Sequence, residues 1–374
     1  MLRRDFIRLV GGGAVFAATG CASAGPDPRA AWSNPGAGET DPRKRALAWA
    51  ILAPNPHNMQ PWLADLSEPD AITLYVDRSR LLPVTDPFNR QIVIGCGAFL
   101  ELLSLAAGAQ GLTATITPFP LGEPAPNLDD RPIARVVLSA GGQADPLFAQ
   151  ALKRRTNRAR YEDRPVTPDA AAAIGAAANL PGVQFGSTVS GAARDRLRAQ
   201  VFEGSVIEAN TADAHQESLE RTFLGAKAVA AHRYGISIEG PAIEAAVATG
   251  LLTRARMAQP GSWAFKQEIA LMKAGSESAA GFVWLTTAGN SRAEQLTAGR
   301  AYLRANLAAT GLGLSMQPWS QGLQEYPTMA GLFTRLHADL TPDGGRIQML
   351  SRIGYAKPIP PAPRRGLAAN LKPA

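Results

Sequence analysis

The chain has 374 residues, 46% of them hydrophobic and 18% charged, which is enough length and apolar content for two globular units. Its net charge of +7 at pH 7 is mild and no basic run is interleaved with aromatic residues, so the composition argues against a nucleic-acid partner. Cys21 and Cys96 are too few for a disulfide framework, and the four histidines lack metal-binding spacing, so no metal site is expected.

The N-terminus has the pattern of an export signal. Residues 3–7 read Arg-Arg-Asp-Phe-Ile, a twin-arginine pattern, and the apolar run 9–20 is too short for a stable transmembrane helix. The run ends in Ala-Thr-Gly-Cys, which resembles a lipobox with Cys21 as the lipidated residue. We therefore predict that residues 1–21 are a twin-arginine signal and that the protein is extracytoplasmic (periplasmic) and membrane-anchored by lipid. A buried N-terminal helix is the alternative. Twin-arginine export carries proteins that fold first, usually around a cofactor.

Residues 22–41 are rich in Pro, Gly, Ser and Ala without periodicity and are predicted to form a flexible tether. Beyond them, hydrophobic periodicity predicts mixed helices and strands, which indicates an α+β or α/β sandwich. Helices are expected over residues 46–52, 91–109, 168–178, 191–209, 212–231 and 292–309, and strands over 72–76, 113–117, 133–139, 281–287, 313–316 and 346–354.

A weak internal repeat divides the body of the chain. Gly97 in the first long helix corresponds to Gly299 in the last one. The same spacing then pairs Leu105, Ala106, Ala107, Gly111 and Leu112 with Leu307, Ala308, Ala309, Gly313 and Leu314. Ala-rich helices can match by chance, but a repeat of this length would decide the fold. We predict two tandem halves, 42–150 and 151–366, followed by a tail, 367–374.

The segment 53–62, Ala-Pro-Asn-Pro-His-Asn-Met-Gln-Pro-Trp, ends a helix at a proline and leads to a tryptophan. It resembles the P-S-x-x-N-x-Q-P-W signature of the nitroreductase-fold flavoproteins, in which this loop lies against the isoalloxazine ring of FMN. The resemblance implies flavin contacts from Pro54, Asn55, Pro56, Asn58 and Gln60. Asn-Pro stands here where two serines are usual, which removes a backbone donor. The alternative is an ordinary helix-to-strand turn.

A second segment, 154–161, places four arginines and two short polar residues in eight positions. Guanidinium groups suit bidentate phosphate recognition, although an isolated cluster of this kind is also typical of a solvated surface. The segment resembles the R-R-S-x-R run with which nitroreductases bind the FMN phosphate. The resemblance implies that Arg154, Thr156 and Arg158 bind phosphate, with Arg155 and Asn157 in support.

Each of these two segments occurs once, the loop in the first half and the arginine segment at the start of the second. In the nitroreductase homodimer they come from different subunits. The resemblance therefore implies one FMN per chain, bound across the two halves of a monomeric pseudo-dimer.

Three further segments resemble the same family. The glycine-rich run 311–322 implies that Trp319, Ser320 and Gln321 line the flavin N5. The basic tail implies that Arg364 or Arg365 returns to the phosphate, the alternative being a frayed Pro-rich end. Residues 86–90, Asp-Pro-Phe-Asn-Arg, resemble the tandem-repeat, Acg-like branch.

The resemblance implies an FMN-dependent oxidoreductase. Hydride would pass through flavin N5 from a small-molecule donor, with NAD(P)H one candidate, to an aromatic nitro- or quinone-like acceptor. Because the cofactor carries this chemistry, no catalytic side chain is expected. The alternatives are a flavin-binding or flavin-sequestering protein with little turnover and a solute-binding lipoprotein without flavin.

The segment 205–275 is long enough to form a helical lid over the flavin. Its part 231–241 breaks the helical pattern with two glycines and a proline, and Tyr234 or Trp263 is expected at the tip. A surface loop joining two packed helices is the alternative.

Overall fold

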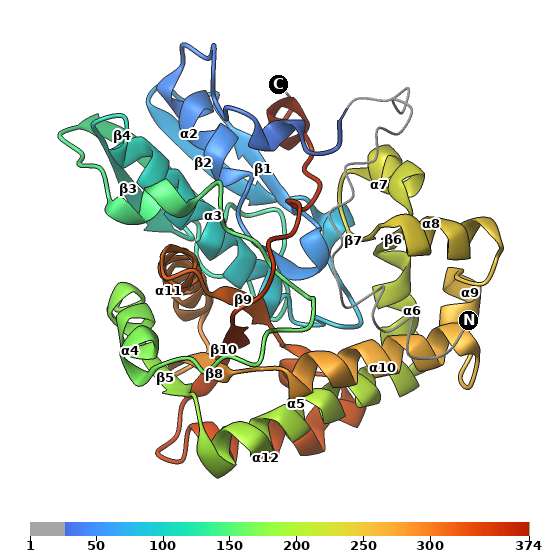
Figure 1. The fold of residues 1–374 in the computed structure, drawn as a ribbon. Coiled ribbons are helices and arrows are strands. Elements are labelled where there is room, and N and C mark those ends of the chain that lie inside the picture. The colour runs from blue at the N-terminus through green and yellow to red at the C-terminus, as the bar shows by residue number, and fades with distance from the viewer. Residues whose placement is uncertain (1–26, 374) are drawn as a thin grey trace.

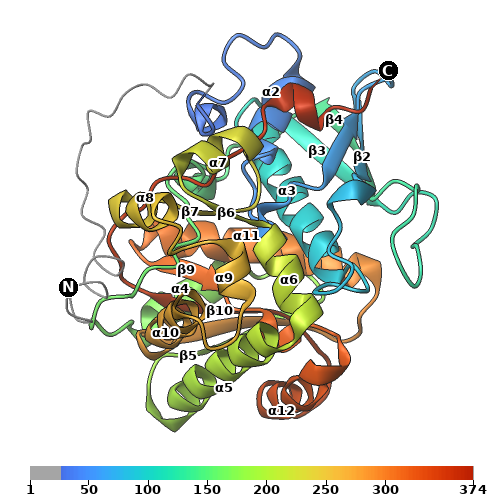
Figure 2. The same ribbon diagram turned by 90° about the vertical axis from the view of Figure 1, so that its right-hand side faces the viewer.

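The computed structural model describes residues 27–373, so the expected signal and Cys21 lie outside the described residues. The chain forms two four-stranded antiparallel sheets, and two long helices, α3 and α11, lie between them (Figure 1). Figure 2 shows a group of shorter helices, α6 to α9, on one side of this arrangement.

The first half holds one sheet and the helix α3. Its strands pair in the order β1-β2-β4-β3, so the third strand in sequence lies at an edge and the fourth lies inside. The elements are α2 (Pro42–Ala50), β1 (Trp62–Asp65), β2 (Ala71–Val76), α3 (Arg90–Gly108), β3 (Leu112–Pro118) and β4 (Ala134–Ala140).

The second half repeats this plan. Its strands pair in the order β5-β8-β10-β9, which again is first, second, fourth, third, with every neighbour antiparallel. The elements are α4 (Pro168–Ala177), β5 (Val183–Thr188), β8 (Gly281–Thr287), α11 (Arg292–Gly311), β9 (Ser315–Pro318) and β10 (Arg346–Gly354). The expected α+β fold with two tandem halves is confirmed.

Two insertions distinguish the second half. Helix α12 (Ala330–Leu340) separates β9 from β10. A longer insertion separates β5 from β8 and contains α5 (Gly191–Asn210), α6 (Ala212–Glu220), β6 (Thr222–Leu224), α7 (Ala226–His232), β7 (Ile236–Ile238), α8 (Pro241–Ala248), α9 (Arg254–Ala258) and α10 (Trp263–Glu277).

The single helix expected over residues 212–231 is wrong. Residues Thr222–Leu224 instead form β6, which pairs in parallel with β7. Gly225, at φ +84°, then turns the chain into the separate helix α7. Pairing with a strand more than ten residues away overrides the local helical pattern.

Helices α3 and α11 cross at a pair of glycines. A Cβ atom added to Gly97 would lie 2.0 Å from the carbonyl oxygen of Leu296, and one added to Gly299 would lie 1.9 Å from that of Ile94. Each added Cβ would also lie 3.0 Å from the Cα of the other glycine. The two backbones are therefore in direct contact, and any side chain at either position would force the halves apart.

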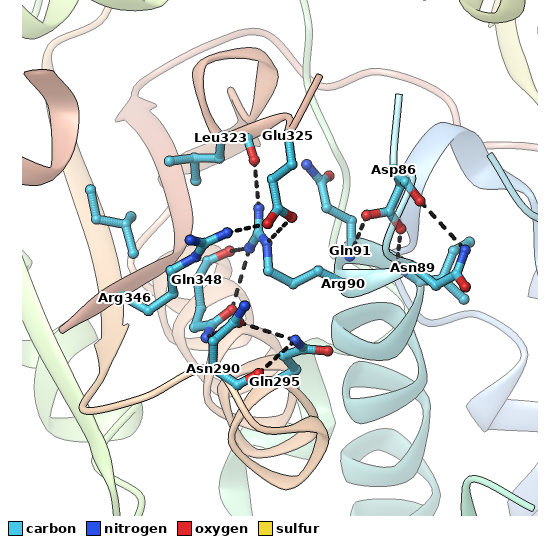
Figure 3. Close-up of polar contacts among 12 residues, drawn as sticks. Asp86, Asn89, Arg90, Gln91, Asn290, Gln295, Leu323, Glu325, Arg346 and Gln348 are labelled. Carbon is cyan, nitrogen blue, oxygen red and sulfur yellow. Dashed lines mark hydrogen bonds and ion pairs between the residues drawn. The ribbon is translucent and has the colours of Figure 1, made fainter. Parts of the chain in front are cut away.

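Charged groups also link the halves. The buried carboxylate of Glu101 on α3 accepts hydrogen bonds of 2.9 Å from both Arg300 and Arg304 on α11. At the other end of α3, the buried guanidinium of Arg90 pairs with Glu325 and donates to the backbone carbonyls of Leu323 and Gln348 (Figure 3). The second half therefore satisfies both buried charges of α3, as burial requires.

Residues 27–41, expected as part of a flexible tether, are instead packed against the C-terminal segment. Trp32 is 8% exposed and its indole donates to the carbonyl of Ala362 at 2.8 Å. Arg364 donates its backbone N–H to the carbonyl of Pro28 at 2.9 Å. The apolar and hydrogen-bonding surface of Trp32 provides the ordering energy that composition alone did not suggest.

The Pro-rich end is ordered as well. Asn157 donates to the carbonyl of Lys357 at 2.9 Å, and Arg155 donates to that of Ile359 at 3.3 Å. Beyond them, Lys372 donates its backbone N–H to Ala64 of β1. The chain from β10 therefore runs back over the first half, and the frayed end considered from composition is not observed in residues 355–373.

Helix α3 is the core helix of the molecule. It is long and apolar enough to cross a membrane, but 89% of its most apolar 18-residue stretch is buried inside the protein. Burial also raises the pKa of Cys96, on this helix, to about 12, so the thiol is protonated at neutral pH. Cys96 is therefore a buried packing residue.

We expect Gly299→Ala to lower the free energy of unfolding by about 1–3 kcal/mol, because its methyl group would overlap a carbonyl oxygen of α3. Gly311→Ala on the same helix is the matched control, since its nearest neighbour would be 3.6 Å away. The control should be neutral or slightly stabilising. Urea unfolding measures both, and equal midpoints would show that the crossing tolerates a methyl group.

Candidate functional site

A cavity lies where the two halves meet. It holds about 930 Å³ of empty space, a figure that includes the open solvent at its mouth. Its walls are Pro54, Asn55, Pro56, His57, Leu82, Thr85, Asp86, Gln91, Ile94, Gly95, Thr156, Arg158, Glu208, Ile236, Tyr302, Gln317, Pro318, Ser320, Gln321, Gln324 and Met349. Both halves and the long insertion therefore contribute.

The loop 53–62 forms one wall and has an unusual backbone. His57, Asn58 and Gln60 all have positive φ angles, of 47°, 53° and 53°. The side chain of Asn55 holds the turn closed, because its oxygen accepts the backbone N–H of Gln60 at 2.7 Å. Gly95 of α3 lets the loop approach, since a Cβ there would lie 3.1 Å from Asn55 and from Pro56.

Not every predicted residue of this loop reaches the cavity. Pro54, Asn55 and Pro56 line it, whereas Asn58 and Gln60 point toward the long insertion and the tail. The Asn58 amide donates to the carbonyl of Gly235 at 3.1 Å, and the Gln60 amide donates to that of Arg233 at 2.9 Å. These two residues therefore hold the insertion and the tail beside the cavity by hydrogen bonds.

The arginine segment supplies free donors. Thr156 and Arg158 line the cavity, and neither side chain donates a hydrogen bond to a residue within 27–373. Arg158 is exposed by its accessible surface, while desolvation by the surrounding protein lowers the pKa of its guanidinium. A charged group with unused donors facing a cavity suits an anion.

Arg154 lies behind this wall and is buried. One terminal nitrogen donates to the carbonyl of Leu52 at 3.3 Å, and the other, Nη1, has no partner in the described part of the chain. Burial lowers the pKa of Arg154 to about 10. By contrast, Arg155 donates through Nε, and Asn157 through its amide, to backbone carbonyls of the tail. Their expected supporting role at a phosphate stays a prediction.

The C-terminal candidates are divided in the same way. Ser320 and Gln321 line the cavity, but Trp319 is packed against α5 and donates to Ser205 at 2.8 Å. Arg364 is buried at the end of α2, where it donates to the carbonyls of Ile51, Leu52 and Ala53. Arg365 donates to the carbonyl of Gln60 and to Asn370. Their assignment to a phosphate stays a prediction.

Four titratable side chains line the cavity that the sequence did not single out: His57, Asp86, Glu208 and Tyr302. Asp86 accepts the backbone N–H groups of Gln91 and Ile92 at the start of α3, while burial raises its pKa to about 6. Burial likewise raises the pKa of Tyr302 to about 12. Asp86 and His57 could have been found from their places in the segments 86–90 and 53–62, whereas Glu208 and Tyr302 carried no local signal.

One wall of the cavity is basic, with Arg158 on it and the buried Arg154 behind it, and both interact electrostatically with Tyr302. Asp86 and Glu208 add two carboxyl groups to the lining. Such a cavity can bind an anionic group at Arg158 and also presents proton-exchanging groups.

The chain is similar to mycobacterial proteins over most of its length. It is 29% identical over 337 residues to Rv3131 of Mycobacterium tuberculosis, named there as a candidate NAD(P)H nitroreductase, which covers 87% of this chain and 89% of that one. The acg protein of the same organism, similarly named, is 40% identical over 81 residues, which is 22% of this chain and 24% of acg.

Two further comparisons add little. The FMN-dependent nitroreductase NfnB of Mycobacterium smegmatis, solved with NADPH, covers 59% of this chain and 95% of its own, with 16% identity and a TM-score of 0.37. A TM-score of this size carries no weight for the fold, which rests on the topology described above. No family model matches the chain.

Proposed function

We propose that the protein is an FMN-binding oxidoreductase that uses the cavity between its two halves. The observation that carries the proposal is the set of unused cationic and hydroxyl donors, Thr156 and Arg158 on the wall and the unpartnered Nη1 of Arg154 behind it. A phosphate group would satisfy such donors. The similarity to proteins named as NAD(P)H nitroreductases supports the oxidoreductase activity.

The residues present fit this cofactor. FMN combines a doubly charged phosphate with a flat ring system, and the cavity combines a basic side with walls from Pro54, Pro56, Ile94 and Met349. Thr156 and Arg158 would hold the phosphate, and the loop at 54–56 would lie against the ring. When bound, FMN would supply hydride transfer through its N5 position.

The chain's own task is then to bind, orient and exclude water. The insertion contributes directly, because Ile236 of β7 lines the cavity, whereas Tyr234 and Trp263 do not. Tyr234 instead stacks under the guanidinium of Arg80, 4.8 Å from its ring centre. We therefore propose Ile236 as the part of the lid that meets the ligand.

We propose an aromatic nitro- or quinone-like acceptor and NAD(P)H as the donor, in line with the names of the relatives. A second candidate function is flavin sequestration with little turnover. Hydrogen bonds between the lid and the first half favour it. Glu217 of α6 accepts the backbone N–H and the hydroxyl of Thr85, at 2.8 and 2.6 Å. A donor must break or bypass these contacts to reach the ring.

Three further features belong to the proposal. The protein is exported by the twin-arginine route, held at the membrane by a lipid on Cys21, and monomeric. The last point is supported by the contact of α3 with α11, which places within one chain the helix pair that would otherwise join two subunits.

We expect the purified protein to bind one FMN per chain and Arg158→Ala to weaken that binding roughly 10- to 100-fold, because each charge-assisted bond to phosphate contributes about 1.5–3 kcal/mol. Arg160→Ala is the matched control, since Arg160 is exposed like Arg158 but does not line the cavity. Flavin fluorescence titration measures both. Equal FMN affinities in the two variants would indicate that the segment 154–161 is a solvated surface cluster. Two FMN per chain would contradict a single site.

We expect Ile236→Ala to speed flavin reduction by NADPH several-fold and to leave reduction by dithionite unchanged, because the smaller side chain widens the path for a nicotinamide. Ile238→Ala is the control, since it lies on the same strand with similar burial but does not line the cavity. Anaerobic stopped-flow absorbance gives both rates. The lid assignment fails if the two variants respond alike.

A further inference from the structure

We propose that His57, Ser218 and Glu208 form a proton relay that protonates the acceptor bound in the cavity. The inference rests on the proposed reductase function and deepens it, because it gives the chain a catalytic residue where the cofactor chemistry alone needs none. The three residues come from separate parts of the chain, namely the loop after α2, the lid helix α6 and the end of α5.

The geometry is continuous. The Nε2 atom of His57 lies 3.1 Å from the hydroxyl oxygen of Ser218, and that hydroxyl donates to Oε1 of Glu208 at 2.6 Å. His57 and Glu208 both line the cavity. A serine between an imidazole and a carboxyl group can pass a proton, since a hydroxyl donates and accepts at once.

Both ends of the relay are held in place. The other carboxyl oxygen of Glu208 accepts the amide of Gln324 at 2.9 Å, and the oxygen of that amide accepts the hydroxyl of Tyr326. His57 has a φ of 47°, a left-handed conformation that a residue with a side chain adopts at an energetic cost. The loop therefore keeps the imidazole at the cavity against the local backbone preference.

The surrounding charges favour a neutral imidazole and a carboxyl group that can hold a proton. Burial, followed by the nearby Arg158 and Arg221, lowers the pKa of His57 to about 4. Burial raises the pKa of Glu208, opposed by its hydrogen bonds from Ser218 and Gln324. The remaining charged neighbours of Glu208 are Glu268, which raises its pKa, and His215, which lowers it.

The transfer balances as follows. Two-electron reduction of a quinone by a hydride gives a hydroquinone monoanion, whose oxyanion needs one proton. The proton on His57 Nδ1 passes to that oxygen, the Ser218 hydroxyl proton moves to Nε2, and the proton of Glu208 moves to Ser218. The product is a hydroxyl group on the acceptor and a carboxylate at Glu208. The relay is then in the arrangement that the structure shows, with Ser218 donating to Glu208. To reset it, solvent returns one proton to Nδ1, the Nε2 proton moves to Ser218, and the Ser218 proton moves to the carboxylate of Glu208.

The first test follows the tautomer of His57 by NMR and needs no catalytic turnover. In ¹⁵N-labelled full-length protein, we expect the His57 imidazole to carry its proton on Nε2 when Glu208 is ionised and on Nδ1 when Glu208 is protonated. A spectrum of His57→Gln assigns the signal among the four histidines. Ser218→Ala or Glu208→Gln should abolish this pH-dependent change of tautomer. A change of tautomer that persists in Ser218→Ala would overturn the relay.

The second test uses the FMN-loaded protein and a 1,4-benzoquinone. We expect His57→Gln and Glu208→Gln each to slow quinone reduction roughly 100-fold, the lower end for general acid catalysis, with flavin content unchanged. In the parent the rate should fall as pH rises through the pKa of Glu208, and Glu208→Gln should lose this dependence. His232→Gln, outside the cavity, is the control.

Parent-like rates in His57→Gln would overturn the proposal. Failure of the parent to bind FMN would overturn the proposed function instead, because the NMR test needs no flavin. A merely structural role for Ser218 predicts lost lid packing with the pH profile unchanged, and that outcome would also refute the relay.

Discussion

The contact of Gly97 with Gly299 is the constraint on which the rest of the structure depends. Two core helices can approach until their backbones touch only where both lack a side chain. The start of α3, with Gln91, and the turn before it, with Asp86, line the same cavity as Tyr302 on α11 and the end of β9. Ile94 and Gly95 of α3 and Tyr302 of α11 line the cavity, so the close packing of these helices helps to set its shape.

The two halves share one topology but contribute different chemistry. The first half supplies the loop with Asn55 and His57, and the second supplies Thr156 and Arg158. Only the second half carries the long insertion between its first two strands. Because of this asymmetry, one cavity combines the arginine segment, the loop 53–62 and the covering insertion. Such a cavity suits a single elongated ligand with one anionic end.

Much of the fold followed from the sequence because it depends on local patterns. The strands 281–287 and 346–354 and the helix 91–109 are apolar runs with clear ends, and they are found within a residue or two. Strand β9 starts two residues late because Gly313, at φ +73°, still belongs to the preceding turn. The helix expected at 212–231 failed because its interruption depends on pairing between β6 and β7, which local periodicity does not encode.

The site was predictable only in part, for the same reason. Short motifs identified Asn55, Thr156, Arg158, Ser320 and Gln321, all of which line the cavity. The motifs could not tell that Arg364 would bind the carbonyls at the end of α2, because nothing in the sequence marks those carbonyls as open. Nor could they join His57 to Ser218 and Glu208, which meet only in three dimensions.

The central claim is that the basic side of this cavity binds the phosphate of a flavin mononucleotide. The most direct measurement compares the affinities of the protein for FMN and for riboflavin, which differ only in that phosphate, by fluorescence titration. The account predicts that FMN binds about 100-fold more tightly or better, since two charge-assisted contacts contribute about 3 kcal/mol or more. Equal affinities for the two flavins would contradict it.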